Sequence, residues 1–323
     1  MPSPNAVFTE IVTTTFRNHP GEITDNVSNH NALYRDLKKR GRTRTESGGH
    51  SIVANLEYAE NGTYQRYSGF DLLNVSQSDV FSAAEFAWRN VAINVVSSGN
   101  ELRMNSGPER IANLAKSRIT NAIHTFANNF SQDLYSDGTL PNQVGGLQAL
   151  VADAGTGTVG GINSSTWPFW QNVVQSAAAP LQGGGAITPS ATTIESLMLP
   201  LYIRLTRGAD KPNLIVASDD YFTFFEQSQT SLKRYMKESE ADAGFMEMAY
   251  KGTRVIFDGS SGMAASRMYF LNTQYLELVV HKEANLTVMD EAKPYNQDAV
   301  VVPILWMGNM VTNNRSLQGI VKA

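Results

Sequence analysis

SGPERIANLAKSRITNAIHTFANNFSQDLYSDG, residues 106–138, is the stretch of sequence that decides the fold. Its apolar residues recur every three or four positions, which is the spacing of a helix with one apolar face. Ser106 and Glu109 have the spacing of a capping box, and Pro108 stands in the first turn, where proline is tolerated. We therefore expect one helix over residues 106–136, roughly 40 Å long, that braces a sheet. Its apolar face is formed by Ile111, Leu114, Ile119, Ile123, Phe126 and Phe130.

Upstream of this helix, residues 51–67 predict a β-hairpin, because apolar and polar residues alternate with a period of two. Asn61-Gly62 is a strong turn signal, since a type I′ turn needs positive φ at both central residues. Residues 63–67 would then be the return strand. A two-stranded hairpin is marginally stable alone, so either a neighbouring subunit or its own domain covers it. The residues expected at an intersubunit contact are Ile52, Leu56, Tyr58, Asn61, Gly62, Tyr64, Arg66 and Tyr67.

The rest of the chain predicts a mixed α+β protein. Residues 1–50 are polar and irregular, with one helical patch near Asn31–Arg40. Residues 139–185 are rich in Gly, Ser and Thr. Further helices are expected over 191–206 and 218–229, and strands at 86–97, 214–217, 253–257, 267–271, 275–281, 299–311 and 316–322.

Composition sets limits on the class of protein. The chain has 323 residues, of which 42% are hydrophobic and 17% charged, and its net charge is −4. Ordinary soluble domains carry roughly 25% charged residues. Because interface cores are depleted in charge, the deficit indicates either self-association or a surface in which neutral polar residues replace charge. The negative charge argues against a dedicated nucleic-acid-binding protein, and we expect neither a signal peptide nor a membrane partner.

A basic cluster lies in the N-terminal segment, at Lys38, Lys39, Arg40, Arg42 and Arg44. Such a cluster can contact phosphate groups. It can also pair with acidic side chains on a solvated or intersubunit face. The negative net charge of the chain favours this second interpretation.

The sequence contains no recognisable constellation for catalysis. Gly155-x-Gly157-x-x-Gly160 matches the dinucleotide fingerprint as a string, but no carboxylate follows at the required distance. The chain has no cysteine, and its five histidines lack the spacing of a zinc site. Neither a nucleophile elbow nor a phosphate-binding loop of the P-loop type occurs. We therefore expect no catalytic, cofactor-binding or metal-binding residues, no cofactor and no enzymatic activity.

Two further features have explanations without catalysis. Asp219-Asp220 stand where a helix is expected to begin, and acids there complement the helix dipole. Trp167, Phe169 and Trp170 are either a ligand-stacking platform or anchors in a core or interface. The enrichment of Trp among interface anchors favours the second interpretation.

The order of these parts resembles that of the major capsid protein of tailed bacteriophages, the Hong Kong 97 fold. The order is polar arm, glycine-flanked hairpin, strand, long helix, mixed α/β region and closing strands. Short segments of the amino-acid sequence are similar as well. The segments that carry the resemblance are Ala32-Leu33-Tyr34-Arg35-x-Leu37, Glu57–Asn61, Arg66–Gly69, Asp133–Gly138, Gly145–Leu150, Gly160–Ile162 and Trp170–Asn172.

This resemblance implies an α+β, Hong Kong 97-like capsid fold. Residues 1–50 would be an N-terminal arm, and residues 51–70 an extended loop that reaches over a neighbouring subunit. Residues 71–138 would form a peripheral domain with a spine helix at 106–136. Residues 139–280 would form a mixed α/β axial domain, and residues 281–323 would be strands that return to the peripheral domain.

The resemblance also implies a function and partners. The chain would self-assemble into hexamers and pentamers of an icosahedral head that encloses double-stranded DNA without sequence recognition. The head would be assembled in the host cytoplasm, with separate scaffolding, cement or decoration proteins as candidate partners. Some relatives crosslink their shells through a lysine on the extended loop. Residues 50–70 contain no lysine, so we expect no such crosslink from this loop.

Two alternatives stay open at the level of sequence. One is an encapsulin-like nanocompartment shell, which shares the fold and packages an enzyme. The other is an ordinary α/β small-molecule-binding or enzymatic domain that uses residues 139–280.

Overall fold

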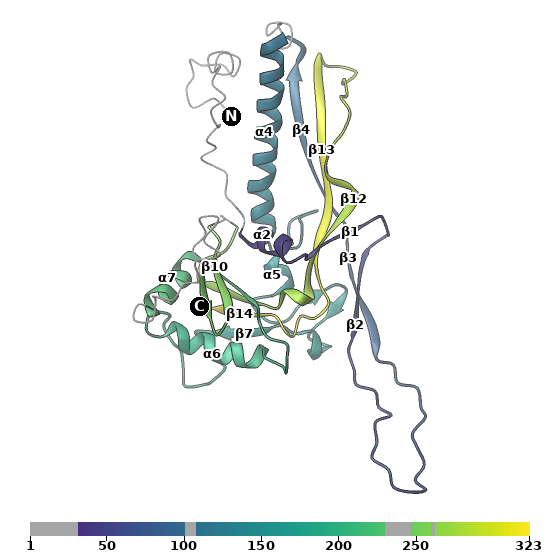
Figure 1. Ribbon diagram of the computed structural model, residues 1–323, viewed down its shortest axis with the longest axis vertical. Helices are drawn as coiled ribbons and strands as arrows, with labels where there is room; N and C mark the ends of the chain where they lie inside the picture. The colour runs from purple at the N-terminus through teal and green to yellow at the C-terminus, as the bar shows by residue number, and fades with distance from the viewer. Residues whose placement is uncertain (1–31, 101–107, 230–246, 260–261) are drawn as a thin grey trace.

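The computed structural model describes residues 32–100, 108–229, 247–259 and 262–323; over positions 108–123 it describes side chains only at 118, 121 and 122. Figure 1 shows a long helix beside a narrow sheet at one end, a rounded α/β body at the other, and a loop that projects from their junction. Residues 1–31, and Ser106 with its expected cap, lie outside the described residues.

The narrow sheet has four strands in the order β1-β12-β13-β4. β4, β13 and β12 pair antiparallel, and β1 joins the edge of β12 in parallel. The strands expected at 86–97, 275–281 and 299–311 are confirmed, although β12 continues seven residues further than expected, to Val288. The four strands are β1 (Thr43–Glu46), β4 (Arg89–Ser98), β12 (Leu276–Val288) and β13 (Ala299–Thr312).

The long helix α4 (Pro108–Asp133) runs along this sheet, and Pro108 is its first residue, as expected (Figure 1). The rings of Phe126 and Phe130 stack with their centroids 5.1 Å apart, and Phe130 meets Trp306 of β13 at 4.8 Å. These contacts bury one end of the apolar face against the sheet, which confirms the bracing role. The other predicted face residues lie on α4, but their side chains are outside the described residues: Ile111, Leu114, Ile119 and Ile123.

α4 ends three residues before the expected end at 136. The Leu134 carbonyl accepts a hydrogen bond of 2.8 Å from the Leu147 amide. A Cβ on Gly146 would lie 2.4 Å from the Asp133 carbonyl oxygen, so only glycine fits beside the helix end. The chain therefore leaves the helix to bond with a later segment, which helical periodicity does not reveal.

The rounded body is built on a six-stranded sheet in the order β7-β14-β11-β8-β10-β9. α6 (Ile194–Leu205) packs on β7 and β14, and α7 (Asp219–Ser228) packs on β10. The helices expected at 191–206 and 218–229 and the strands expected at 214–217, 253–257 and 267–271 are confirmed. The six strands are β7 (Val173–Ser176), β8 (Leu214–Ala217), β9 (Glu247–Tyr250), β10 (Thr253–Phe257), β11 (Arg267–Leu271) and β14 (Gly319–Lys322).

The strand expected at 316–322 is present as β14, but its position differs from the expected one. β14 lies between β7 and β11, within the sheet of the rounded body. The expectation that all of residues 281–323 return to the peripheral domain is therefore wrong for β14. The connection from β13 to β14 is fixed by Arg315, whose side chain is fully buried. Its guanidinium donates hydrogen bonds to the carbonyls of Leu150 and Trp170 and to the side chains of Ser164 and Asn172.

The remaining elements are short and join the two sheets to the loop. The helical patch expected near Asn31–Arg40 is confirmed as α2. These elements are α2 (Ala32–Lys39), β2 (Ile52–Glu57), β3 (Phe81–Phe86), α5 (Leu147–Leu150), β5 (Thr158–Val159), β6 (Ile162–Asn163), η1 (Pro168–Trp170) and η3 (Thr273–Tyr275).

Candidate assembly surface

The projecting loop begins as a two-stranded ribbon in which β2 pairs antiparallel with β3 (Figure 1). Ile52 lies opposite Phe86, and Glu57 lies opposite Phe81. The predicted hairpin is wrong in its second strand, because residues 63–67 do not pair with β2. The loop consequently extends well past the expected boundary at residue 70.

Asn61-Gly62 forms a local turn and not the tip of the hairpin. The Tyr64 amide donates to the Asn61 carbonyl at 3.3 Å, and the Thr63 amide donates to the Asn61 side-chain oxygen at 3.0 Å. Gly62 does not have the positive φ that a type I′ turn requires. The strong local turn signal is therefore used within one arm of the loop.

Beyond the ribbon, side chains hold the two arms of the loop together. The Asn74 side-chain amide donates to the Gly62 carbonyl at 3.2 Å, and the Gln65 side-chain amide donates to the Leu72 carbonyl at 2.9 Å. Gln65 also accepts from the Asn74 amide at 3.1 Å. These hydrogen bonds join the two arms beyond the ends of β2 and β3, so side-chain hydrogen bonds replace strand pairing there.

The tip of the loop is a turn around Gly69-Phe70. The Asp71 amide donates to the Ser68 carbonyl at 3.2 Å, and the Ser68 amide donates to the Asp71 carboxylate at 2.8 Å. Gly69 has φ of +54°, a conformation that glycine adopts without strain. Residues 52–86 thus form one long hairpin with its tip at 69–70.

The base of the loop packs on its own chain. Burial alternates strictly along β2, and Ile52 and Leu56 lie on the buried face. The Tyr58 ring, just past β2, meets the rings of Trp167 and Phe169, with centroid distances of 5.9 Å to each. The loop is therefore anchored at its base by apolar contacts that its own domain supplies.

A second contact fixes the base from the side of β3. Gly160, at the tip of the β5–β6 hairpin, accepts a hydrogen bond of 3.0 Å from the Glu85 amide. Gly160 and Gly161 have φ of +58° and +76°, which is the type I′ geometry of a two-residue hairpin turn. A Cβ on Gly160 would lie 2.7 Å from the Cβ of Ala84. The last glycine of the string that matched a dinucleotide fingerprint therefore lies in a hairpin turn that contacts the loop base.

The distal half of the loop carries a large exposed apolar patch. Phe70 is 105% exposed and Leu72 is 95% exposed, relative to the free residue. An isolated exposed apolar side chain is ordinary, but a contiguous group marks an interaction surface. We call this group the distal patch; it consists of Tyr64, Tyr67, Phe70, Leu72, Leu73 and Val75.

The predicted loop residues divide into three groups. Ile52, Leu56 and Tyr58 pack at the base, while Asn61 and Gly62 bond within the loop. Tyr64, Arg66 and Tyr67 are exposed on the distal half. Sequence reasoning missed the second half of the distal patch, Phe70 to Val75. The run FDLLNV, residues 70–75, holds four apolar residues in six and was the available signal.

The basic cluster pairs with acids at the positions where partners are described. Asp36 is buried and contacts both Arg40 and Arg254 at 2.5 Å. Arg44 lies 3.1 Å from Glu46 and 3.3 Å from Glu277. The acid-pairing interpretation of the cluster is therefore confirmed for Arg40 and Arg44.

The described part of the chain holds no group of three or more acidic, histidine or cysteine side chains arranged to bind a metal ion. No helix within it is long and apolar enough to cross a membrane.

The tryptophans in and beside η1 differ in their burial. Trp170 is buried and donates from Nε1 to the Val159 carbonyl at 3.0 Å, whereas Trp167 is half exposed beside the loop base.

No protein-family model matches the sequence, and no curated protein matches it. Solved structures do match. The chain is similar to the chain in the capsid asymmetric unit of cyanophage A-1(L), with a TM-score of 0.72 at 15% identity, over 94% of this chain and 95% of that one.

Two other structures are similar over the same extent. For the capsid of a native GTA particle, the TM-score is 0.57 at 11% identity, over 95% of this chain and 93% of that one. For Mycobacterium phage Bobi, the TM-score is 0.55 at 11% identity, over 96% of each chain. A likeness that covers nearly the whole of both chains shows a shared fold, the α+β Hong Kong 97-like capsid fold.

Proposed function

We propose that this chain is a major capsid protein of a tailed bacteriophage. It assembles with copies of itself into the hexamers and pentamers of an icosahedral head that encloses double-stranded DNA. The fold supports this proposal but does not suffice for it, because one fold can serve many functions. The observation that carries the proposal is the distal patch, which a monomer leaves in water.

The distal patch lies too far out on the loop for its own domain to cover it. Burial of apolar surface contributes roughly 25 cal/mol per Å², so covering six such side chains favours association. A copy of the same chain is the partner that is always present. Contacts of this kind, repeated by symmetry, sum over a closed lattice.

The parts of the chain then take different roles. The hairpin at 52–86 is the extended loop over a neighbouring subunit, and α4 is the spine helix of the peripheral domain. The body built on the six-stranded sheet is the axial domain, whose loops meet around the hexamer and pentamer axes. The packaged DNA is held by confinement, in keeping with the net charge of −4. The product is a virion component assembled in the host cytoplasm.

The shell is held without a covalent link from the loop. Residues 50–88 contain no lysine, so the longer loop defined by β3 offers no amine either. Stabilisation is non-covalent, with a separate cement or decoration protein as a candidate partner. A separate scaffolding protein is a second candidate.

Negative-stain electron microscopy of the expressed chain, alone and with its gene neighbours, tests the proposal. We expect shells, tubes or capsomers. Their absence under every condition would contradict it. An encapsulin-like compartment would instead give uniform shells loaded with an enzyme, and a small-molecule-binding domain would give a small oligomer with a reproducible ligand. Neither alternative is favoured by a specific observation.

A further inference from the structure

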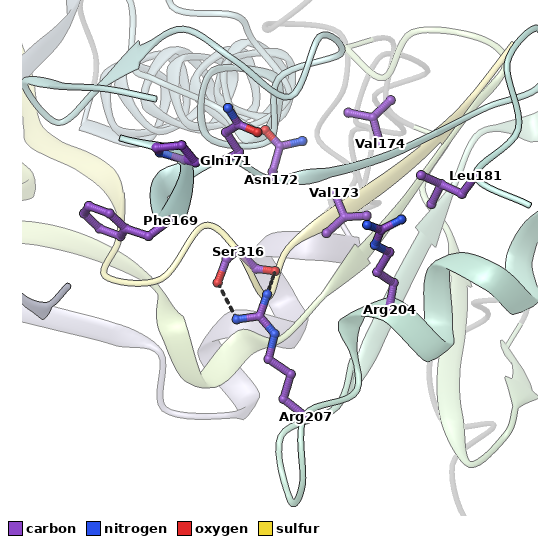
Figure 2. Close-up of a pocket in the computed structure, with 10 residues that line it drawn as sticks. Phe169, Gln171, Asn172, Val173, Val174, Leu181, Arg204, Arg207 and Ser316 are labelled. Atoms are coloured by element: carbon purple, nitrogen blue, oxygen red, sulfur yellow. Dashed lines mark hydrogen bonds between the residues drawn. The ribbon is translucent and has the colours of Figure 1, made fainter. Parts of the chain in front are cut away.

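A pocket of about 410 Å³ lies on the rounded body, between η1, β7, the end of α6 and the connection that precedes β14 (Figure 2). Its lining combines apolar residues with two arginines. We call Arg204 and Arg207 the charged wall, and we call the apolar lining residues the apolar wall: Pro168, Phe169, Val173, Val174 and Leu181.

The charged wall is arranged to receive an anion. Arg207 donates to the Ser316 hydroxyl at 3.0 Å and to the Ser316 carbonyl at 3.5 Å, which holds its guanidinium at the pocket (Figure 2). Arg204 lies in the last turn of α6 and also lines the pocket, and Figure 2 shows its side chain near those of Val173 and Leu181. Among the described residues that line the pocket, none is acidic. A carboxylate is the side-chain partner that guanidinium groups bind best.

We infer that this pocket receives the loop tip of a second copy of the chain. Phe70 packs against the apolar wall, and the Asp71 carboxylate pairs with Arg204 and Arg207. This inference rests on the proposed function, because it requires that copies of the chain assemble. It names the surface that covers the outermost part of the distal patch.

The choice of occupant follows from exposure and charge. Phe70 and Tyr295 are the most exposed large hydrophobic side chains among the residues that the structure describes, at 105% and 107%. Phe70 is followed directly by Asp71, whereas the charged residue nearest to Tyr295 in sequence is Lys293. A lysine would be repelled by the two arginines. The loop tip therefore complements the pocket in both apolar character and charge.

The contact is heterologous, since the tip and the pocket are different surfaces. Each copy offers one tip and one pocket, so a rotation that closes generates a ring in which every pocket is filled. Figure 1 shows the loop running away from the rounded body, so the tip reaches the pocket of another copy and not its own.

A charge swap tests the inference. The tip variant Asp71→Arg and the pocket variant Arg204→Glu with Arg207→Glu should each lower the assembled fraction on the order of tenfold, because close charge pairs couple strongly. A chain that carries all three substitutions should recover most of that loss, since every interface again pairs opposite charges. Phe70→Ser should lower assembly without a change of charge. Assembled and free fractions are measured by size-exclusion chromatography and electron microscopy.

Matched controls separate this contact from general charge effects. Glu60→Arg changes an exposed acid on the same loop, and Lys211→Glu changes an exposed base near α6. Both should assemble like the wild type. Circular dichroism and thermal melts of every variant should match the wild type, so that a loss of assembly reports the interface.

Four outcomes overturn the inference. The first is that the tip or pocket variants assemble normally, and the second is that the triple variant recovers no assembly. The third is that Tyr295→Ser lowers assembly as much as Phe70→Ser does. The fourth is that the pocket variants form normal shells that contain no DNA. In each case wild-type shells would leave the proposed function standing. If the wild type itself never assembles, the proposed function fails and the inference fails with it.

Discussion

Nη2 of Arg315 donates a hydrogen bond of 2.9 Å to the Oδ1 of Asn172 inside the protein, and no carboxylate is among the described partners of the guanidinium. The other partners are also neutral: the carbonyls of Leu150 and Trp170 and the Ser164 hydroxyl. Desolvation by burial lowers the pKa of Arg315 to about 10, so the side chain still carries its charge at neutral pH. Arg315 thereby ties the start of β14 to residues 150–172.

Arg315→Met should lower the free energy of unfolding by about 3 kcal/mol, because it leaves several buried acceptors without a donor. Arg315→Lys should recover only part of this loss, since an ammonium group cannot reach acceptors spread around a planar fork. Arg66→Met, an exposed arginine on the loop, is the matched control and should change stability by less than about 0.5 kcal/mol. Urea unfolding of unassembled chain measures all three. Equal stability of Arg315→Met and Arg66→Met would contradict the role of the network.

Gly160→Ala and Gly161→Ala separate backbone strain from a steric clash at the loop base. Both positions have positive φ, so each alanine should cost about 1–2 kcal/mol of stability. The methyl group added by Gly160→Ala would lie 2.7 Å from the Cβ of Ala84, whereas the methyl group added by Gly161→Ala would have no atom within 4 Å. Gly160→Ala should therefore cost about 1–3 kcal/mol more than Gly161→Ala. Thermal unfolding of the two variants measures the difference. An equal loss of stability in both would show that the loop base shifts to accommodate the added methyl group.

Local patterns predicted the elements whose causes are local. The apolar period of α4 and the apolar run of β8 (Leu214–Ala217) are properties of adjacent residues. Both elements could therefore be predicted without knowledge of the elements on which they pack. The end of α4 could not, because the carbonyls of Leu134 and Ser136, just past the helix, bond to a segment that begins at Leu147. The place of β14 could not either, since an isolated apolar strand fits either sheet.

The loop shows how a local signal can mislead. Asn61-Gly62 predicted a hairpin turn, and a turn does form there, but the partner of β2 begins only at Phe81. Beyond the strands, hydrogen bonds from Gln65 and Asn74 join the two arms, and these bonds have no sequence signature of their own. Half of the distal patch was therefore missed, although the projecting loop itself was expected. The pocket at Arg204 and Arg207 joins segments far apart in sequence and had no linear motif.

Replacing residues 59–79 with Asn-Gly should leave a folded subunit that forms no shells. The replacement joins Tyr58 to Val80, whose backbones already pair at 3.0 Å, through a turn that suits a two-residue hairpin. β2, β3 and the contacts of Tyr58 are retained, so the free energy of unfolding should change by less than about 1 kcal/mol. Circular dichroism and electron microscopy report folding and assembly separately. An unfolded product would show that the distal loop belongs to the core of its own subunit.

The start of α7 makes stability depend on pH through Asp220. Burial acts to raise the pKa of Asp220, but hydrogen bonds from Ser218, from the hydroxyl and amide of Ser266 and from the Tyr221 amide outweigh it, and the pKa is lowered. The folded state therefore holds a proton on this carboxyl less readily than the unfolded state does. The resulting stabilisation is complete above the ordinary aspartate pKa of about 4 and is lost as the pH falls through the folded value.

Asp220→Asn removes that dependence. The wild type should exceed the variant in unfolding free energy at neutral pH, and the gap should narrow as the pH is lowered towards about 3. Asp219→Asn removes the same charge from the neighbouring residue, which makes no contact with Ser266, and controls for the helix dipole and the net charge. Urea unfolding across this pH range measures both gaps. A gap for Asp220→Asn that stays constant with pH would show that its hydrogen bonds, and not its ionisation, stabilise the junction between β8 and α7.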